Sequence, residues 1–435
     1  MIYFGTDGIR GIAGEELTHE ICFRCGNALS TIKKNCKIVI GRDTRTSGGF
    51  VLSSFVSGAT MGGADVIDVG IVPTPAVSVL TRKLNADFGV MISASHNPPE
   101  YNGIKIFDGN GKKIGLEQEI QIEKHFAKQK IANANKFGKY LLRPKLIKLY
   151  VKFLIDSIGV RLDGLKVAID CSNGANYLIA GKVFKKLGAQ VVKIHCANKG
   201  EKINCGCGAL YPQKLASVVK KIKADIGFAF DGDADRIVVV DADGNIVDGD
   251  QIILFLTEMY QKFGLLKTGA VVGTSQTNMA VEKQLGSVGL KLIRADVGDK
   301  FVTEEMSKRN LQIGGEQSGH IILMDYEPTG DGLLCALVIS KFLPKLDGKF
   351  GDYIFKNLMK QHTKNIVVVN KYQIINSSAT KIAISECESL LQGKGRVVVH
   401  ASGTEPKIRI MVESEDEKLA NIVLKKMENV IGSFN

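Results

Sequence analysis

Short apolar runs alternate with helix-length segments through most of this chain, and the alternation restricts the fold more than any other feature. Each run has the length of a buried strand and is followed by glycine or polar residues. Repeats of this kind predict βαβ units with mixed, mainly parallel sheets, and therefore an α/β fold. The predicted strands are 37–41, 64–70, 88–92, 165–169, 189–194, 224–230, 270–273, 290–293 and 311–314.

Three of the predicted strands lead into similar polar loops, "IVIGRDTR", "VAIDCSNG" and "VVGTSQTN". This similarity predicts three related α/β units. From about residue 365 the pattern changes to "NIVVV", "RVVVHASGTEPKIRIMVE" and a helix for which Ser414 and Glu417 predict a capping box. A small α+β domain is therefore expected at the end of the chain. The predicted domains are 1–142, 143–246, 247–358 and 359–435.

Length and composition indicate a folded globular enzyme with several domains. The chain has 435 residues, too many for one ordinary core, and its 45% hydrophobic and 23% charged residues exclude a disordered or fibrous protein. No apolar stretch is long enough to span a bilayer, and the opening "MIYFGTDGIRG" lacks a basic segment followed by an apolar one. We therefore expect a cytoplasmic protein without a membrane partner.

The charge distribution restricts the kinds of partner that we expect, and the cysteine content restricts the expected role of the thiols. The formal net charge is +12, but the lysines are spread along the chain without a block of like charge, so we expect no nucleic acid partner. A basic protein suits a small anionic substrate such as a sugar phosphate. Nine cysteines indicate reduced thiols, and Cys22 and Cys25 are interpreted as buried helix residues rather than metal ligands.

The stretch "MISASHNPPEYNGIKIF" places a serine where a strand ends. The predicted strand 88–92 is followed by Ser95 and then by prolines, asparagines and glycine, which favour an ordered loop. Strand ends of this kind often carry chemistry in α/β proteins. A serine hydrolase is disfavoured because Ser95 lacks the G-x-S-x-G frame.

A second loop, "FAFDGDADRIVVV", carries Asp231, Asp233 and Asp235 directly after an apolar strand. Carboxylates this close repel one another unless a cation lies between them. A calcium EF-hand is excluded because Arg236 and Ala242 occupy the positions that need glycine and an acid. Oxygen ligands at a strand end suit Mg²⁺, which leaves room for a phosphate oxygen.

Two further loops carry polar residues beside glycines. "IGGEQSGHII" offers a carboxylate and a hydroxyl that suit the hydroxyls of a sugar. "HASGTEPKIRI" combines hydroxyls, a glycine and cations in a plausible phosphate nest that lacks Walker spacing. Arg10, Arg42 and Arg45 add cations near the N-terminal end. Together these loops favour phosphoryl transfer on a sugar, where catalysis consists mostly of positioning and charge neutralisation.

The motifs "FGTDGIRG", "SASHNP", "DGDADR", "GGEQSGH" and "SGTEP", in this order, resemble the α-D-phosphohexomutase superfamily almost end to end. The resemblance implies four domains around a central cleft, three related α/β domains and a C-terminal α+β domain, each giving one loop. It also implies that Ser95 is carried as phosphoserine and that Mg²⁺ is the metal cofactor.

The resemblance is strongest to the amino-sugar members of the superfamily, and it implies their reaction. Phosphoserine would give its phosphoryl group to O1 of glucosamine 6-phosphate, forming a sugar 1,6-bisphosphate that also serves as activator. After the intermediate reorients, its 6-phosphoryl group would return to Ser95 and leave glucosamine 1-phosphate, a precursor for cell-wall synthesis. The implied partner is a small sugar phosphate, and the implied assembly is a monomer or a homodimer.

The resemblance also implies a role for each matching residue. Lys105 would act as general acid/base, for which its pKa would have to be lowered. The implied catalytic residues are Ser95, Lys105, Arg10 and His96, the metal ligands are Ser95, Asp231, Asp233 and Asp235, the substrate-binding residues are Arg236, Glu316, Ser318 and His320, and the phosphate-binding residues are Ser402, Gly403, Thr404 and Arg409.

Some positions depart from the family pattern. His400 stands shortly before "SGT" where an arginine is usual, Lys300 replaces a frequent arginine in "DVGDKFV", and "INCGCGALYP" lacks residues common in relatives. Gln317 favours the amino sugar, because relatives specific for hexoses often carry methionine there. The alternatives are a phosphomannomutase or phosphoglucomutase of the same superfamily, or a sugar-phosphate phosphatase that uses Asp231 as its nucleophile.

Overall fold

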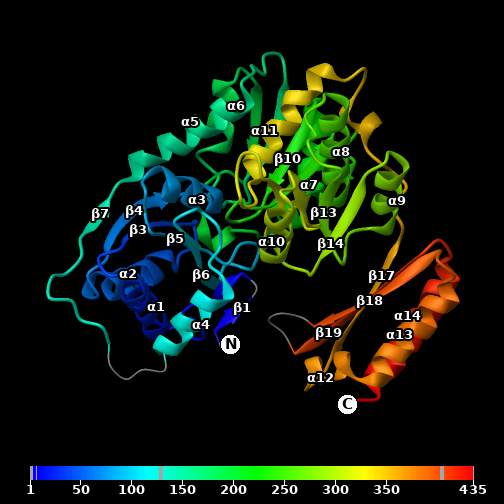
Figure 1. Ribbon diagram of the computed structural model, residues 1–435. Coiled ribbons are helices and arrows are strands. Elements are labelled where there is room, and N and C mark those ends of the chain that lie inside the picture. Colours follow the sequence, from blue (N-terminus) through cyan, green and yellow to red (C-terminus); the bar gives the residue numbers. More distant parts are fainter. Residues whose placement is uncertain (1–2, 6, 127–130, 402–405, 435) are drawn as a thin grey trace. The chain divides into compact units, whose positions relative to one another are not determined.

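The computed structural model describes residues 3–5, 7–126, 131–401 and 406–434 (Figure 1). The chain forms two compact units. The first comprises Met1–Lys267 and Gly298–Ile354, and the second comprises Thr268–Val297 and Phe355–Asn435. No helix within the described ranges is long and apolar enough to cross a membrane.

The first unit begins with a seven-stranded sheet in the order β1-β2-β6-β5-β3-β4-β7. Strands β5, β3, β4 and β7 run parallel, whereas β1, β2 and β6 pair antiparallel. Strand β6 returns beside β5 with Lys105 opposite Met91, so Lys105 lies next to the strand that leads into the Ser95 loop. The strands are β1 Phe4–Gly5, β2 Gly8–Ile12, β3 Lys37–Arg42, β4 Asp65–Ile71, β5 Phe88–Ile92, β6 Tyr101–Asp108 and β7 Tyr140–Leu142, and the helices are α1 His19–Ile32, α2 Gly48–Met61, α3 Thr74–Lys83 and α4 Leu116–Phe126.

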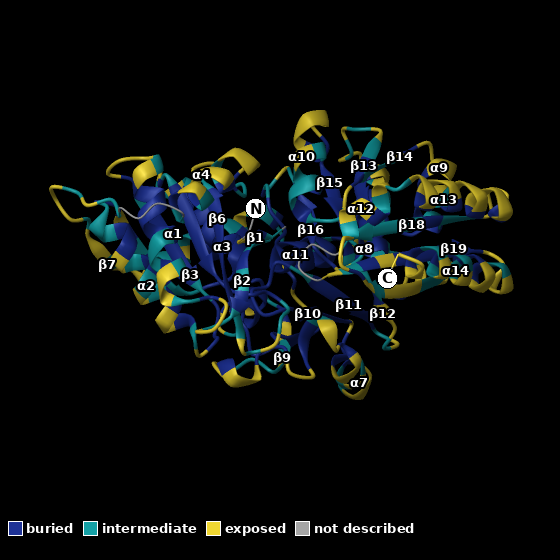
Figure 2. Ribbon diagram, turned by 90° about the horizontal axis from the view of Figure 1, so that it is seen from below, coloured by how far each residue is buried: buried dark blue, intermediate teal, exposed yellow. Residues whose placement is uncertain are grey.

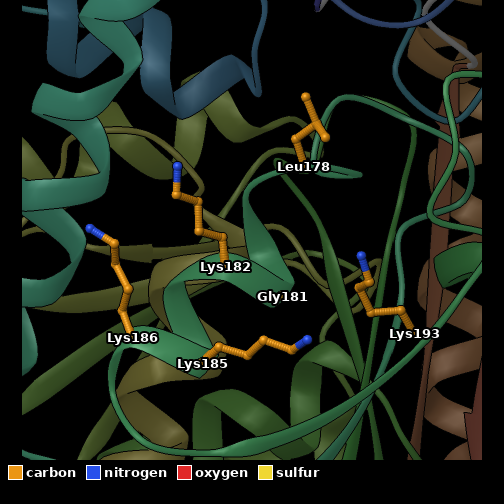
Figure 3. A pocket seen from close by; sticks show the side chains of 6 residues that line it. All are labelled: Leu178, Gly181, Lys182, Lys185, Lys186 and Lys193. Atoms are coloured by element: carbon orange, nitrogen blue, oxygen red, sulfur yellow. The ribbon is translucent and has the colours of Figure 1, made fainter.

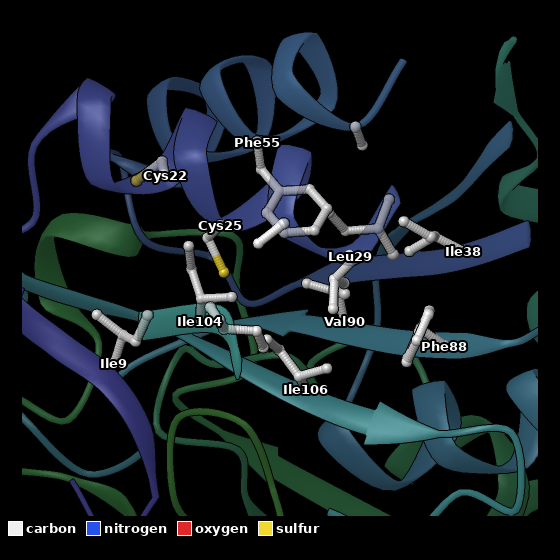
Figure 4. Packing of buried hydrophobic residues seen from close by; sticks show 14 of the residues in the cluster. Ile9, Cys22, Cys25, Leu29, Ile38, Phe55, Phe88, Val90, Ile104 and Ile106 are labelled. Carbon is white, nitrogen blue, oxygen red and sulfur yellow. The ribbon is translucent and has the colours of Figure 1, made fainter. Parts of the chain in front are cut away.

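Helices α1 and α2 cover this sheet with an apolar core. Cys25, Leu29 and Phe55 from the helices face aliphatic residues of β3, β5 and β6 (Figure 4). The two helices pack closely because glycines lie at their contact, where a Cβ on Gly26 would come within 2.1 Å of the Phe55 carbonyl oxygen. Cys22 and Cys25 are fully buried, which confirms their interpretation as core residues of a helix.

A five-stranded sheet follows in the order β12-β11-β10-β8-β9, in which β9, β8 and β10 run parallel. Strand β10 ends at Phe230, and the Asp231 loop turns the chain back into antiparallel β11. A hairpin turn at Asp241–Asn245 joins β11 to β12. The elements are η1 Pro144–Leu146, α5 Ile147–Ile158, β8 Lys166–Asp170, α6 Ala180–Lys186, β9 Gln190–Ile194, η2 Gly200–Lys202, η3 Gly208–Leu210, α7 Gln213–Ile222, β10 Ile226–Phe230, β11 Ile237–Asp241 and β12 Ile246–Val247.

The remainder of the first unit carries an antiparallel hairpin, β15 with β16, whose turn holds Glu316, Ser318 and His320. Strands in these layers are largely buried, and exposed residues gather on helices such as α4 and α7 (Figure 2). The elements here are α8 Gly249–Lys262, α10 Asp299–Arg309, β15 Ile313–Gly315, β16 Ile321–Leu323, α11 Gly332–Phe342, η4 Leu343–Lys345 and η5 Phe350–Tyr353.

The second unit contains the parallel pair β13 and β14 and an antiparallel sheet in the order β17-β19-β18. Its last helix is capped by Asp416, which accepts hydrogen bonds from the N–H groups of Lys418 and Leu419. The predicted Ser414/Glu417 capping box is therefore wrong, because strand β19 continues through Ser414 and the helix begins later. The elements are β13 Ala270–Thr274, α9 Met279–Ser287, β14 Lys291–Ala295, β17 Gln361–Val367, α12 Lys371–Asn376, α13 Ser378–Leu391, β18 Gly395–Ala401, β19 Lys407–Ser414 and α14 Glu417–Gly432.

The predicted fold class is confirmed: α/β layers with mixed sheets are followed by an α+β segment.

Candidate active site

Ser95 is fully buried and has a left-handed backbone conformation, with φ of 52°. Its hydroxyl donates a hydrogen bond of 2.6 Å to Asp231 Oδ2. Its carbonyl oxygen accepts hydrogen bonds from Arg45 at 3.0 Å and from Asn204 Nδ2 at 2.9 Å. A strained backbone persists only where the surroundings over-determine it, and such positions cluster at functional sites. The structure therefore fixes the Ser95 hydroxyl against a buried carboxylate.

Arg45 holds the Ser95 loop in place through hydrogen bonds to its backbone. Its side chain is buried and pairs with Asp43 at 2.9 Å. Its remaining N–H groups donate to carbonyl oxygens of the loop, including that of Asn97 at 2.8 Å and that of Tyr101 at 2.9 Å. The expectation that Arg45 adds a cation for phosphoryl transfer is therefore not supported by its position, because these donors are all used inside the protein.

The three aspartates of the second loop converge on one point. One carboxylate oxygen from each of Asp231, Asp233 and Asp235 lies within 4.8 Å of the others, and all three residues are buried. Asp233 Oδ1 and Asp235 Oδ1 are buried without a hydrogen-bond partner in the described part of the chain. Buried carboxylate oxygens need a partner, and a hard divalent cation satisfies several at once. The donor set and its unpartnered oxygens therefore fit a metal such as Mg²⁺.

A close approach between the serine and aspartate loops depends on Gly232. A Cβ at this position would lie 2.6 Å from the Ser95 carbonyl oxygen, so any larger residue would push the two loops apart. Thr74 also secures the second loop, since its hydroxyl donates to Asp233 Oδ2 at 2.5 Å.

Lys105 is a buried cation shared by three carboxylates. Its Nζ lies 2.7 Å from Asp233 Oδ2, 2.8 Å from Asp235 Oδ2 and 3.1 Å from Asp7 Oδ2. Burial favours the neutral amine, but the charges of Asp233, Asp235 and Asp7 outweigh it and hold the pKa of Lys105 well above its usual value. The lowered pKa expected for a general base is therefore absent from this arrangement. Lys105 therefore holds its proton in this arrangement.

Two carboxylates of the aspartate loop differ in pKa. Burial, reinforced by repulsion from Asp235 and Asp233, raises the pKa of Asp231 well above its usual value. For Asp235 the charges of Lys105 and His320 overcome burial and hold the pKa well below its usual value. Asp231, which accepts the Ser95 hydroxyl proton in a hydrogen bond, is therefore the more basic of the two.

His96 and Arg10 lie beside Ser95. The ring atom Nδ1 of His96 is 3.4 Å from Ser95 Oγ, and Arg10 donates to Asn97 Oδ1 at 3.1 Å. Burial, with the nearby positive charges of Arg236 and Arg10, lowers the pKa of His96 to about 3. His96 is therefore a neutral imidazole at physiological pH.

Asp7 and Lys113 complete this cluster and were not predicted as site residues. Asp7 forms ion pairs with Arg10, Lys105 and Lys113, and Lys113 Nζ also lies 2.5 Å from Asp299 Oδ2. Asp7 stands within the quoted "TDGIRG" motif, so a local signal existed for it. Lys113 has no such signal, because its partners are far away in the sequence.

The predicted substrate residues differ in accessibility. Glu316 is half-buried and accepts from the Gly298 N–H at 3.0 Å, and Ser318 is exposed beside it. Arg236 directs its Nε toward Asp235 at 4.0 Å. His320 is buried, with Nδ1 3.8 Å from Asp235 Oδ1, so it supports the aspartate loop.

The departures from the family pattern have defined positions. Lys300 Nζ pairs with Glu119 at 3.0 Å in the first unit. In the second unit His400 lies 3.1 Å from the Gln276 side-chain nitrogen, and it stands opposite Arg409 in the β18–β19 register. Burial, together with the charge of Arg409, lowers the pKa of His400, so it is not a substitute cation for arginine. The predicted phosphate-binding residues Ser402, Gly403 and Thr404 lie outside the described residues.

Known protein families and individual relatives match this chain in sequence over almost its whole length. Four sequence families match it: Phosphoglucomutase/phosphomannomutase alpha/beta/alpha domain I at 1–132, domain II at 148–244, domain III at 248–366 and the C-terminal domain at 359–430. A phosphoglucosamine mutase of Clostridium acetobutylicum is 43% identical over 98% of each chain. One of Pelotomaculum thermopropionicum is 40% identical over 99% of each chain.

Solved structures agree in fold at lower identity. A phosphoglucomutase/phosphomannomutase family protein of Burkholderia thailandensis superimposes with a TM-score of 0.81 and 22% identity, covering 99% of this chain and 96% of that chain. An N-acetylphosphoglucosamine mutase of Aspergillus fumigatus, solved with GlcNAc-6P and magnesium, superimposes with a TM-score of 0.69 and 16% identity, covering 100% and 96%.

Proposed function

The chain belongs to the phosphoglucosamine mutase family, and on this basis we propose that it interconverts glucosamine 6-phosphate and glucosamine 1-phosphate. The observation that carries the proposal for this chain is the buried Ser95 hydroxyl, 2.6 Å from Asp231 and beside a cluster in which Lys105 pairs with Asp233 and Asp235. A weak nucleophile, an acceptor for its proton and a fixed cation are the parts that phosphoryl transfer needs.

In the proposed cycle Ser95 alternates between a phosphoserine and a free hydroxyl. The phosphoryl group moves from Ser95 Oγ to O1 of the sugar, the O1 proton leaves, and Ser95 Oγ gains a proton. The resulting hydroxyl is then held by its hydrogen bond to Asp231. After the sugar 1,6-bisphosphate reorients, the same steps run in reverse at O6, and the product is the 1-phosphate.

In the proposed mechanism, fixed charges stabilise the negative charge on the transferring phosphoryl group. Lys105 keeps its proton, and its positive charge can stabilise the oxygen that leaves phosphorus. Arg10 and Arg236 add permanent positive charge, and neutral His96 can accept a hydrogen bond without adding charge. Asp231, Asp233 and Asp235 would hold Mg²⁺ together with an oxygen on Ser95, and the cation would neutralise charge on the transferring phosphoryl group.

Glu316 and Ser318 are proposed to bind the sugar. They stand on the turn of a hairpin whose strands are buried, where Ser318 is exposed and Glu316 is half-buried. The carboxylate of Glu316 can accept hydrogen bonds from hydroxyl or amino groups of the substrate. Arg409, with Ser402, Gly403 and Thr404, is proposed to bind the phosphate that is not reacting.

Phosphorus NMR tests the proposal directly. Purified protein with Mg²⁺ and a trace of sugar bisphosphate would receive glucosamine 6-phosphate, mannose 6-phosphate or glucose 6-phosphate in separate tubes. A 1-phosphate signal that grows fastest from the amino sugar supports the proposed substrate. Fastest conversion of mannose or glucose phosphate would move the assignment to a hexose mutase, and release of inorganic phosphate alone would replace it with a phosphatase. The Ser95→Ala variant, purified identically, controls for mutase from the expression host.

A further inference from the structure

Three side chains of metal-ligand type converge at the edge of the second sheet, outside the residues used above. Asp170 is the last residue of β8, His195 follows β9, and Cys207 precedes η3. One ligand atom from each lies within 4.8 Å of the other two. Because β8 and β9 are parallel neighbours, their carboxyl ends meet at one edge of the sheet. This group shares no residue with the Asp231 group.

The first two members already hold each other in place. Asp170 is fully buried, its Oδ1 accepts from the Ser172 N–H at 2.9 Å, and its Oδ2 lies 2.8 Å from His195 Nδ1. His195 has a left-handed backbone with φ of 45°, and its carbonyl oxygen accepts from the Asn173 N–H at 2.6 Å. The hydrogen bond fixes the orientation of both side chains, so they are held in place before any ion binds.

Cys207 reaches the pair through a turn that depends on glycine. Gly206 and Gly208 flank it with φ of 59° and 71°. A Cβ at Gly208 would come within 2.4 Å of the Ser172 Cβ, so only glycine lets this turn close against the end of β8. The Cys207 side chain is buried, whereas Cys205 in the same turn is exposed. The chain therefore brings one of two neighbouring thiols to the carboxylate and the imidazole.

The group can be reached from solvent through His195. The His195 side chain is 20% exposed and, with Cys196, lines a cavity of about 430 Å³. Lys193, Lys199 and Lys202 also line it, and Lys193 borders a second cavity with Lys182, Lys185 and Lys186 from α6 (Figure 3).

The lysines that line these two cavities would repel a free divalent cation. A divalent ion bound by one carboxylate and one thiolate is electrically neutral with its ligands, so the repulsion would act on the free ion and not on the bound one.

We propose that Asp170, His195 and Cys207 form a binding site for Zn²⁺. Mixed sulfur, nitrogen and oxygen donors suit Zn²⁺, whereas Mg²⁺ and Ca²⁺ require oxygen ligands. Ligand atoms around a tetrahedral zinc lie roughly 3.5 Å apart. The three ligand atoms lie within 4.8 Å of one another, and the Asp170–His195 pair is in hydrogen-bond contact at 2.8 Å. Binding therefore needs the Asp170–His195 pair to open slightly and the more distant atoms to move inward. Binding forms a Zn–S bond and releases the Cys207 thiol proton to solvent. Solvent fills the fourth position.

Cobalt substitution tests this site without using enzyme activity. Reduced full-length protein, freed of metal with a chelator, would be titrated with Co²⁺ and followed by absorption in the near ultraviolet. A cobalt–thiolate bond gives a charge-transfer band, whereas cobalt on the Asp231 group gives none, because that group has no cysteine. We expect the band in the unaltered protein and in Cys205→Ser, the matched control from the same turn, and its loss in Cys207→Ser and His195→Ala.

Competition with a chromogenic chelator gives the Zn²⁺ affinity for the same proteins. Cys207→Ser should weaken the tight site at least about 100-fold, and circular dichroism would confirm that the variant remains folded. The proposal is overturned if the unaltered protein shows no thiolate band, or if the band survives in Cys207→Ser. Loss of the band in Cys205→Ser alone would also overturn it, because the ligand would then be the exposed thiol.

Discussion

Replacing Lys105 with methionine measures what a buried cation contributes when it is surrounded by acids. Methionine keeps most of the volume of the lysine stem and removes the charge. Lys105 is 1% exposed and lies within 3.1 Å of the carboxylates of Asp7, Asp233 and Asp235. Asp7 keeps Arg10 and Lys113, but Asp233 loses its only ion-pair partner in the described part of the chain.

Removing one partner of a buried ion pair leaves an uncompensated charge and costs about 3–5 kcal/mol. We therefore expect Lys105→Met to lower the free energy of unfolding by about this amount when a chelator is present. Mg²⁺ should restore part of it, because the variant frees the oxygens of Asp233 and Asp235 that Lys105 occupies. A cation at 100 times its dissociation constant stabilises by about 2.7 kcal/mol.

Urea unfolding, followed by far-ultraviolet circular dichroism with chelator and with Mg²⁺, provides the assay. Lys152→Met is the matched control, since Lys152 forms an exposed pair with Asp156 and its loss should cost less than about 0.5 kcal/mol. The chain has more than one unit, so the transitions would be fitted separately. A loss below about 1 kcal/mol in chelator, or an equal Mg²⁺ effect in variant and unaltered protein, would refute the electrostatic reasoning.

Three further outcomes are expected. Ser95→Ala should lower mutase turnover at least about 1,000-fold in the coupled assay for glucosamine 1-phosphate, and substantial remaining turnover would contradict the phosphoserine cycle. Glu316→Ala should raise KM for the sugar phosphate while Mg²⁺ affinity, measured by calorimetry, stays unchanged; an unaltered KM for every substrate would remove Glu316 from the site. Burial raises the pKa of Asp331 to about 7, so the folded state holds this proton more tightly and stability from Asp331 is lost as pH rises from about 4 to 7. In urea, Asp331→Asn should therefore gain stability relative to the unaltered protein between pH 5 and pH 8, and a constant difference would count against that shift.

The parts of the site that the sequence revealed are those where polar residues interrupt an apolar strand. Ser95 and the aspartates of 231–235 stand out because β5 and β10 end shortly before them. The two strands belong to different sheets, so the sequence pattern marks each loop separately and does not predict that they meet. The alternation of strands and helices likewise predicted the α/β layers, because burial of one face is a local property of each segment.

What the sequence did not reveal depends on contacts between distant segments. Lys113 became a site residue only through Asp7 and Asp299, and no local pattern signals such pairs. The sequence indicated Arg45 only as one of several cations near the N-terminal end, yet the loop that it supports lies about 50 residues further along the chain. The pKa of Lys105 was expected to fall, but the count of carboxylates around it reverses that direction, and only the folded structure supplies that count.

The hydrogen bond between Ser95 and Asp231 joins residues separated by 136 positions. During synthesis from the N-terminus, the serine loop is completed well before the aspartate loop exists. A nascent chain in this interval has a serine but neither the acceptor for its proton nor the acidic cluster beside it. The hydrogen bond therefore forms only after the Asp231 loop has been synthesised and has packed against the Ser95 loop at Gly232.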